Sequence, residues 1–302
     1  MTLVYGTPLV APPPPVSPWV RSGMVWTGWD GSEWNLSDPA GGVFITGDVE
    51  GLGMPTHQAW VGESPAVHGQ YYRGHVVEPR SVFWPIYLYS DAGTDEWMDL
   101  DRAFWRSLQP GKHGKWSVTT LRGGTRSLSC RFVDDGRHAF PRDPMVRGWA
   151  SYGVTLVADS PFWTGEPVRR TWSDGEESDI FAQRMPLKIV SGSQLGSAKM
   201  TNEGDLEAWP VWTIKGPLSS VTVGVDGATV QWNVALTGSD ILVIDTDPTV
   251  QCAWLNGVDV TSQLGTANFA PIPAGHEMPL SLTMAGTGSV EASISPRFYR
   301  AW

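Results

Sequence analysis

The histidines and cysteines of this chain are the residues that could hold a metal ion, and their spacing gives no such site. No two histidines are four residues apart, as neighbours on one face of a helix would be, and none stands beside a cysteine. The two cysteines, Cys130 and Cys252, are too few and too far apart for a zinc site or a disulfide scaffold, so we expect two buried free thiols. The histidines are His57, His68, His75, His113, His138 and His276.

Catalytic motifs are also missing from the sequence. There is no nucleophile elbow, no phosphate-binding P-loop and no dinucleotide fingerprint, and no expected helix follows the glycine-rich segment 47–53. Neighbouring acids such as Glu176 and Glu177 indicate solvated turns, whereas a glycosidase needs two carboxylates facing each other across a cleft. Asp245 and Asp247 lack the spacing of a calcium-binding loop. We therefore predict a protein that is not an enzyme and has no catalytic, cofactor-binding or metal-binding residues.

Composition limits the remaining functions. The 302 residues are 41% hydrophobic, which is enough for a packed core, and the formal net charge of −10 opposes tight binding to nucleic acid. We find no signal peptide and no run of 18 apolar residues, so we expect synthesis in the cytoplasm and no contact with a membrane.

Tryptophan is the most unusual component, with 17 copies. Such residues can fill a core, anchor a protein–protein contact or stack on a sugar ring. Trp26, Trp29 and Trp34 lie so close together among glycines that we expect some of them at an assembly interface. Trp209 and Trp232 are the candidates for stacking on a glycan.

The N-terminal half predicts a β-domain, residues 1–165, that contains one helix. Its first residues form a proline-rich arm, interpreted either as a polyproline spacer or as an arm laid on a neighbouring subunit. Short strands follow, with a hairpin turn at Asp30-Gly31, and Pro85 predicts an edge or a bulge in the strand 81–90. The helix covers about residues 95–108, and Thr94 or Asp95 is expected to cap it. The prolines of the arm that we expect at an interface are Pro12, Pro13, Pro14 and Pro15.

The second half, residues 166–302, shows about eight short strands separated by turns and no helical pattern. This pattern is typical of a β-sandwich or jelly roll. We place the boundary in the polar stretch that starts at Trp163. The fold class predicted for the whole chain is mainly β, in two domains.

The order of several motifs resembles the distal tail proteins of siphophages, which are often called minor tail proteins in phages of actinobacteria. In the first half the motifs are G-D-V-E-G-L-G-M-P, the helix ending in L-x-P-G, G-K-W-S-V, R-S-L-S-C-R-F and A-D-S-P-F-W. In the second half they are T-N-E-G, W-P-V-W-T-I-K-G-P, W-L-N-G-V-D-V-T and F-A-P-I-P-A-G, which are similar to the galectin-like β-sandwich of that family.

The resemblance implies a structural virion protein at the distal end of a non-contractile tail. Copies would form a homo-oligomeric ring, typically a hexamer, that joins the tail tube to the tail-tip or baseplate hub. Its partners would be the tail tube protein, the tape measure protein and the hub or tip proteins, with DNA only as passing cargo. The proline-rich start and the tryptophan-dense segment 24–36 depart from the simplest members of the family.

The sequence allows two other functions. One is a carbohydrate- or receptor-binding module of a tail tip, which concerns the second half and could coexist with the ring. The other is a cell-wall hydrolase, which the missing pair of carboxylates and the missing zinc site disfavour.

Overall fold

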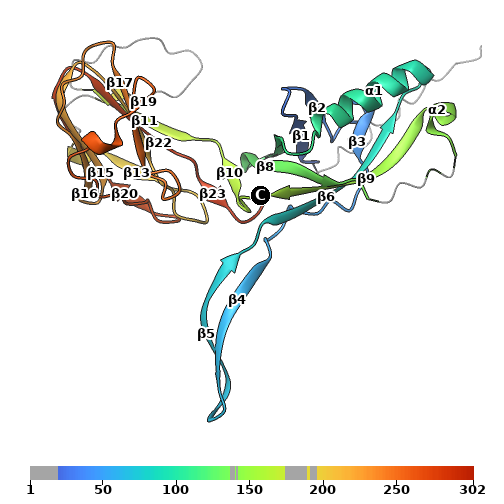
Figure 1. The fold of residues 1–302 in the computed structure, drawn as a ribbon, viewed down its shortest axis with the longest axis horizontal. Coiled ribbons are helices and arrows are strands. Elements are labelled where there is room, and N and C mark those ends of the chain that lie inside the picture. The colour runs from blue at the N-terminus through green and yellow to red at the C-terminus, as the bar shows by residue number, and fades with distance from the viewer. Residues whose placement is uncertain (1–19, 137–139, 141, 174–188, 191–195) are drawn as a thin grey trace, which may run out of the picture.

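Two β-rich bodies lie side by side, and a long hairpin projects away from the first of them (Figure 1). The computed structural model describes residues 20–136, 140, 142–173, 189–190 and 196–302. Strands dominate both bodies, and one long helix, α1, lies on the first. The mainly β fold class predicted from the sequence is confirmed.

The first body is built on a nine-stranded antiparallel sheet. Its main path runs β2-β1-β7-β8-β9-β6-β3, and β10 and β23 join it beside β8. The hairpin predicted around Asp30-Gly31 is confirmed, with Gly31 in the left-handed region at φ 79°. The strands are β1 (Gly23–Thr27), β2 (Glu33–Asn35), β3 (Val43–Ile45), β6 (Arg80–Tyr89), β7 (His113–Thr120), β8 (Gly124–Asp134), β9 (Trp149–Ala158), β10 (Trp163–Gly165) and β23 (Arg297–Phe298).

The edge strand or bulge predicted at Pro85 is wrong, because β6 pairs without interruption with β9 and is flanked on its other side by β3, which pairs with Ile86–Leu88. The carbonyl of Pro85 accepts a hydrogen bond from the backbone of Thr46 at 3.1 Å, so this residue faces the β3 side. The short strand β3 ends at Ile45, one residue before that level. Proline is tolerated inside this sheet because its missing N–H would lie where the neighbouring strand has already ended.

Helix α1 (Thr94–Ser107) covers the apolar face of this sheet, as the three- and four-residue spacing of its large side chains predicts. Trp97 and Phe104 are buried against the sheet. The carboxylate of Asp101 accepts hydrogen bonds from the hydroxyl of Tyr152 on β9 at 2.6 Å and from the indole of Trp105 at 3.1 Å. The helix is thereby tied to the sheet by a polar contact as well as by its apolar stripe.

The cap and the second helix differ from the sequence interpretation. Gly93 is the N-cap and no side chain caps the helix, because the hydroxyl of Thr94 instead donates to the carbonyl of Met145. Met145 belongs to a short helix that the sequence did not predict, α2 (Pro144–Arg147), which Asp143 caps. A 3₁₀ turn, η1 (Pro39–Gly41), precedes β3.

Four tryptophans form a continuous row through the first core. Trp26 packs edge-on against Trp84 with ring centroids 5.3 Å apart, Trp84 against Trp116 at 5.3 Å, and Trp116 lies 4.9 Å from Trp163. Edge-to-face contacts at such distances contribute beyond the area that they bury. Much of the tryptophan content of the first half therefore serves the core.

Glycine is required at position 114 by the first residue of this row. A Cβ atom at Gly114 would meet ring atoms of Trp26 at 2.3 Å and the carbonyl oxygen of Thr27 at 2.8 Å. We expect Gly114→Ala to lower the free energy of unfolding by about 2 kcal/mol through overpacking. Urea unfolding followed by tryptophan fluorescence measures it. The control is Gly111→Ser, which lies in the open turn before β7 and tests backbone strain without a clash. Equal stability of Gly114→Ala and the native chain would contradict the packing argument.

The second body contains a seven-stranded sheet of order β12-β11-β22-β14-β17-β18-β19, a three-stranded sheet β16-β15-β21 and the pair β13-β20. A second apolar core lies between these sheets, with Trp212 and Trp232 inside it. The strands are β11 (Val168–Ser173), β12 (Ile189–Val190), β13 (Lys199–Thr201), β14 (Val211–Lys215), β15 (Leu218–Val225), β16 (Ala228–Trp232), β17 (Ile241–Asp245), β18 (Cys252–Leu255), β19 (Val258–Asp259), β20 (Glu277–Pro279), β21 (Thr283–Gly286) and β22 (Ser289–Ile294), with a 3₁₀ turn η3 (Thr261–Gln263).

The end of the chain returns to the first body. Strand β23 pairs with β10 inside the nine-stranded sheet, and the guanidinium of Arg126 lies 3.5 Å from the ring centroid of Phe298. The stretch interpreted as a polar linker contains β10 and β11, one in each large sheet. The boundary at residues 165/166 stays a prediction, and the last residues, from Arg297, belong by pairing to the first sheet.

Candidate assembly surface

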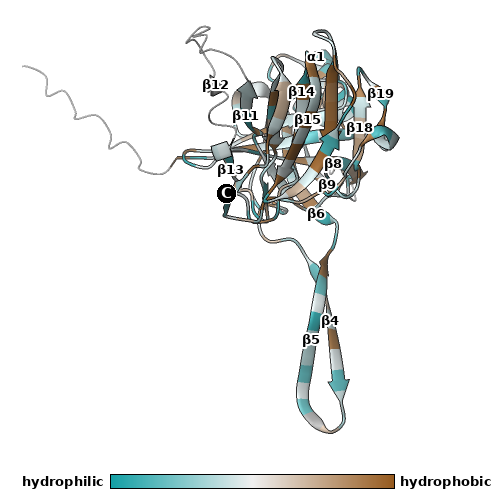
Figure 2. Ribbon diagram, turned by 90° about the vertical axis from the view of Figure 1, so that its left-hand side faces the viewer, coloured by the Kyte–Doolittle hydropathy of each residue, from teal (hydrophilic) through white to brown (hydrophobic). Residues whose placement is uncertain are grey.

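A two-stranded hairpin, β4 (His57–Ser64) and β5 (Val67–Val77), stands clear of both bodies in the two perpendicular views (Figures 1 and 2). Within the described residues, its strands pair with each other and with no third strand. Trp60 is 54% exposed and Tyr72 is 64% exposed, and Val61, Tyr71 and Val76 are exposed as well. An isolated hairpin is marginally stable in water, and an exposed cluster of aromatic side chains marks a surface for binding a partner.

The base of the hairpin is held by a buried arginine. Arg80, the first residue of β6, is 3% exposed and donates hydrogen bonds of 2.6–2.8 Å to four backbone carbonyls. Burial lowers the pKa of its guanidinium to about 10, so it stays charged at neutral pH. The acceptors are Gly51 and Gly53 before the hairpin, Pro161 before β10 and Tyr299 near the C-terminus. One side chain thus fixes the hairpin base to the returning end of the chain.

Beside this base lies a groove of about 310 Å³ whose walls are mainly apolar. His57 and His75 face each other across the two strands with ring centroids 5.6 Å apart, and His75 also hydrogen-bonds the hydroxyl of Tyr72. Tyr299 closes the groove from the C-terminal segment. The groove continues the apolar surface of the hairpin onto the first body.

Of the tryptophans predicted at an interface, only Trp29 is well exposed. Trp26 is 1% exposed and its indole donates to the hydroxyl of Ser107, so it cannot reach another chain, and for this residue the prediction is wrong. Trp34 is partly buried against Phe104. Trp29 is 42% exposed and donates to the carbonyl of Arg106. The prolines Pro12, Pro13, Pro14 and Pro15 lie outside the described residues.

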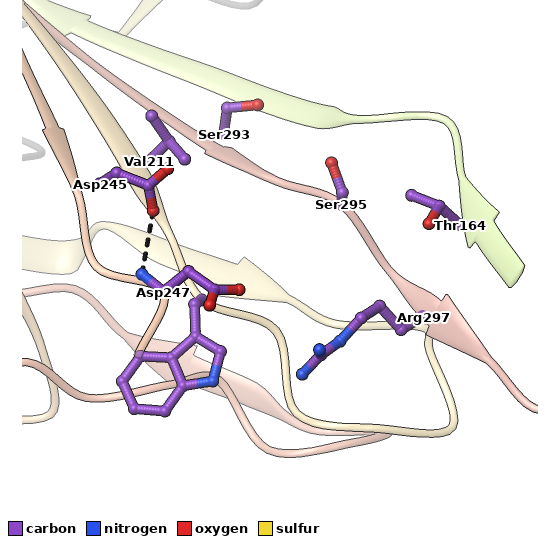
Figure 3. Close-up of a pocket in the computed structure, with 8 residues that line it drawn as sticks. Thr164, Val211, Asp245, Asp247, Ser293, Ser295 and Arg297 are labelled. Carbon is purple, nitrogen blue, oxygen red and sulfur yellow. Dashed lines mark hydrogen bonds between the residues drawn. The ribbon is translucent and has the colours of Figure 1, made fainter. Parts of the chain in front are cut away.

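The two tryptophans predicted to stack on a glycan lie in different surroundings. Trp232 is 1% exposed inside the second core, so a sugar cannot reach it and the prediction for this residue is wrong. Trp209 is partly exposed and lines a cleft of about 210 Å³ (Figure 3). The same cleft is lined by Asp245, Asp247 and Arg297.

Metal and thiol chemistry have little support in the described part of the chain. No three histidine, cysteine or acidic side chains there come together as a metal site. Cys130 is buried in the first core, where desolvation raises the pKa of its thiol to about 12 and keeps it protonated at neutral pH. Cys252, expected to be buried, is only partly so.

Sequence reasoning missed the hairpin as a functional element. The sequence up to Val61 predicts only a glycine-rich loop, residues 47–53, that leads into an extended segment. The signal of the hairpin was available, because strand-forming residues stand on both sides of Pro65 and Ala66, tryptophan and valine before them and valine and tyrosine after them, as in two paired strands. Its lack of a partner within the chain could not be inferred, since exposure depends on where the flanking strands direct it.

Comparison with known proteins gives relatives from tailed phages. The chain is 27% identical over 209 residues to the minor tail protein Gp27 of Mycobacterium phage D29 and 24% identical over 209 residues to the Gp27 protein of Mycobacterium phage L5. In both cases the match covers 64% of this chain and 61% of the relative, so it spans less than two thirds of the relatives' length. No family model matches the sequence.

Solved structures share the fold over nearly the whole chain. The SPP1 Dit (gp 19.1) protein, described as a hub of the adsorption apparatus of phages that infect Gram-positive bacteria, superposes with a TM-score of 0.63 at 10% identity. That match covers 92% of this chain and 100% of the Dit chain. A chain of the phage P2 baseplate in its activated conformation superposes with a TM-score of 0.56 at 13% identity, covering 92% and 98%.

No helix in the part of the chain that the structure describes is long and apolar enough to cross a membrane. The sequence relatives are minor tail proteins and the matching folds are Dit and baseplate chains. The resemblance to siphophage distal tail proteins is thereby confirmed, in sequence by the mycobacteriophage minor tail proteins and in fold by the Dit protein.

Proposed function

We propose that this chain is a structural virion protein whose copies form a six-membered ring at the distal end of a non-contractile phage tail. The ring joins the tail tube protein to the hub and tip proteins and leaves a channel for the tape measure protein and the DNA. The similarity to minor tail proteins and the Dit fold support a structural role in the tail. We propose further that the chain has no enzymatic activity and that the arm from Pro12 to Pro15 contacts a neighbouring copy.

The observation that carries the ring is the projecting hairpin. A surface that reaches out from one side of a chain and binds a different surface of the next copy makes a head-to-tail contact, and such contacts form a ring when the rotation from copy to copy closes. Trp60, Tyr71 and Tyr72 supply the aromatic anchors that dominate protein–protein binding. Burying them on the next copy would also stabilise a hairpin that lacks support within its own chain.

The acidic balance fits a channel through which DNA slides. Each copy carries a formal net charge of −10, and a wall of like charge repels the phosphate backbone. An electropositive channel in a ring structure would contradict this part of the proposal.

The mass of the purified chain in solution tests the ring. We expect a species about six times heavier than the 32.9 kDa chain. We expect the double change Trp60→Ser and Tyr72→Ser to shift it to monomer, because the lost apolar anchors account for a large share of the contact. Removal of residues 1–18 in the same assay tests the arm.

The matched control is Leu121→Ser, which removes an even more exposed apolar side chain from the turn between β7 and β8. It should leave the mass unchanged, and circular dichroism should show that all variants are folded. A native chain that stays monomeric at every concentration and does not bind tail tube protein would refute the proposal.

A further inference from the structure

The outward face of the seven-stranded sheet in the second body carries an unusual set of side chains. Strands β22, β14 and β17 alternate strictly, so that Trp212 and Ile214 point into the core while Val211 and Thr213 point outward. By the same alternation Glu291, Ser293, Val243 and Asp245 lie on the outward face, all partly exposed. Polar side chains in the middle of a sheet are free to bind a ligand when no layer of the chain covers them.

The strand register also places a tryptophan, Trp254, on this face. Thr213 lies opposite Glu291 on one side and Val243 on the other, and Val243 lies opposite Trp254 on β18. Neighbouring strands are about 4.8 Å apart, so Trp254 stands about 10 Å from Thr213 along this row. Trp254 is partly exposed.

The next row ends in the cleft of about 210 Å³. Val211 lies opposite Ser293 and Asp245, and Trp209, two residues earlier in the chain, lines the same cleft. Figure 3 shows the Asp247 carboxylate and the Arg297 side chain at the cleft, which Trp209 also lines. Trp209 thus offers an aromatic side chain to a cleft that charged groups also line.

Hydrogen bonds within the chain hold these polar groups in place. The backbone N–H of Asp247 donates to the Asp245 carboxylate at 2.9 Å, and the Asp247 carboxylate accepts from the backbone and the hydroxyl of Thr249 at 2.9 and 2.7 Å. The Arg297 guanidinium donates to the carbonyl of Glu207 at 3.0 Å. A site whose polar groups are already fixed loses less entropy when it binds a ligand.

We propose that this cleft binds a saccharide of at least two rings, independently of the proposed ring assembly. One sugar ring lays its C–H face on Trp209, while its hydroxyls donate to Asp245 and Asp247 and accept from Arg297. The chain of sugars then runs along the outward face towards Trp254. An aromatic wall with a few fixed polar groups of both kinds suits a ligand that has an apolar face and a hydroxyl-rich edge.

Binding of the full chain to an array of linear and branched glucans, galactans and arabinans tests the site, followed by titration calorimetry with the best oligosaccharide. We expect Trp209→Ala to weaken that binding at least about tenfold, a loss of about 1.4 kcal/mol. Trp209→Phe should retain most of it, because it keeps an aromatic wall. Trp302→Ala removes a more exposed tryptophan that does not line the cleft and should change nothing.

Two results would overturn the proposal. One is the absence of saccharide binding by the native chain up to about 1 mM, the weak end of specific affinities, even if a protein or peptide binds instead. The other is saccharide binding that survives Trp209→Ala unchanged. The mass of each variant in solution is measured in the same preparations, so a failed ring and a failed saccharide site are told apart.

Discussion

Arg80→Met is expected to lower the free energy of unfolding of the first body by about 4 kcal/mol. Methionine keeps much of the volume of the arginine stem, so the packing loss is small. The loss comes from four backbone carbonyls, at Gly51, Gly53, Pro161 and Tyr299, which lose a charged donor in a place that water reaches poorly. A buried acceptor without a partner costs about 1–3 kcal/mol, and the partial relaxation of four neighbouring groups keeps the sum below the simple total.

The effect of Arg80 should depend on the shape of its side chain as well as on its charge. Arg80→Lys keeps the charge but offers one ammonium group in place of a planar fork, so it should recover only part of the loss. Denaturant unfolding followed by tryptophan fluorescence measures all three proteins. The control is Arg122→Met, an exposed arginine in the turn between β7 and β8, which should change the stability by less than about 0.5 kcal/mol. An Arg80→Met chain as stable as the control would show that the four hydrogen bonds contribute nothing.

Asn202→Ala is expected to lower the stability of the second body by about 3 kcal/mol. The amide of Asn202 is fully buried and donates to the carbonyls of Leu206 and Ile272 at 2.7 and 3.0 Å, with a weaker contact to that of Pro273 at 3.3 Å. Its oxygen accepts from the backbone of Gly204 at 2.9 Å. Alanine leaves these groups unpaired in the interior and opens a small cavity as well.

The same change should loosen the returning end of the chain. A Cβ atom at Gly204 would meet backbone atoms of Arg297 at 2.8 Å, and the backbone of Asp205 donates to the carbonyl of Arg297 at 2.8 Å. The C-terminal segment therefore packs on the loop that Asn202 shapes. Hydrogen exchange should show faster exchange at residues 297–301 in Asn202→Ala. Asn268→Ala, at an exposed asparagine, should be neutral in both measurements, and unchanged exchange in Asn202→Ala would refute the coupling.

Much of the fold follows from local patterns in the sequence. The helix at α1 was predictable because Trp97, Leu100, Phe104 and Leu108 fall on one face, and this face does bury its large residues. The hairpin of β7 and β8 was predictable because two alternating segments flank a pair of glycines. These signals depend only on residues close in sequence, so they can be recognised without knowledge of the rest of the chain.

The motif T-N-E-G carried the resemblance without an explanation, and its physical reason is now clear. Asn202 accepts a hydrogen bond from the backbone of Gly204 in the buried loop, and Gly204 leaves room for the backbone of the C-terminal segment at Arg297. A motif of this kind is structural. It therefore predicts the fold of the second half more directly than it predicts a ligand.

The sequence by itself determined the mainly β class, the amphipathic helix, most strands and the absence of recognisable catalytic motifs, because all of these depend on residue types and short spacings. Only the tertiary structure decided which tryptophans are reachable. Trp26 and Trp232 are sealed in the two cores, whereas Trp60, Trp209 and Trp254 remain accessible to different degrees. It also placed β23 beside β10 and Pro85 opposite the end of β3. Exposure and strand pairing of this kind are set by segments up to hundreds of residues apart, and local composition does not encode them.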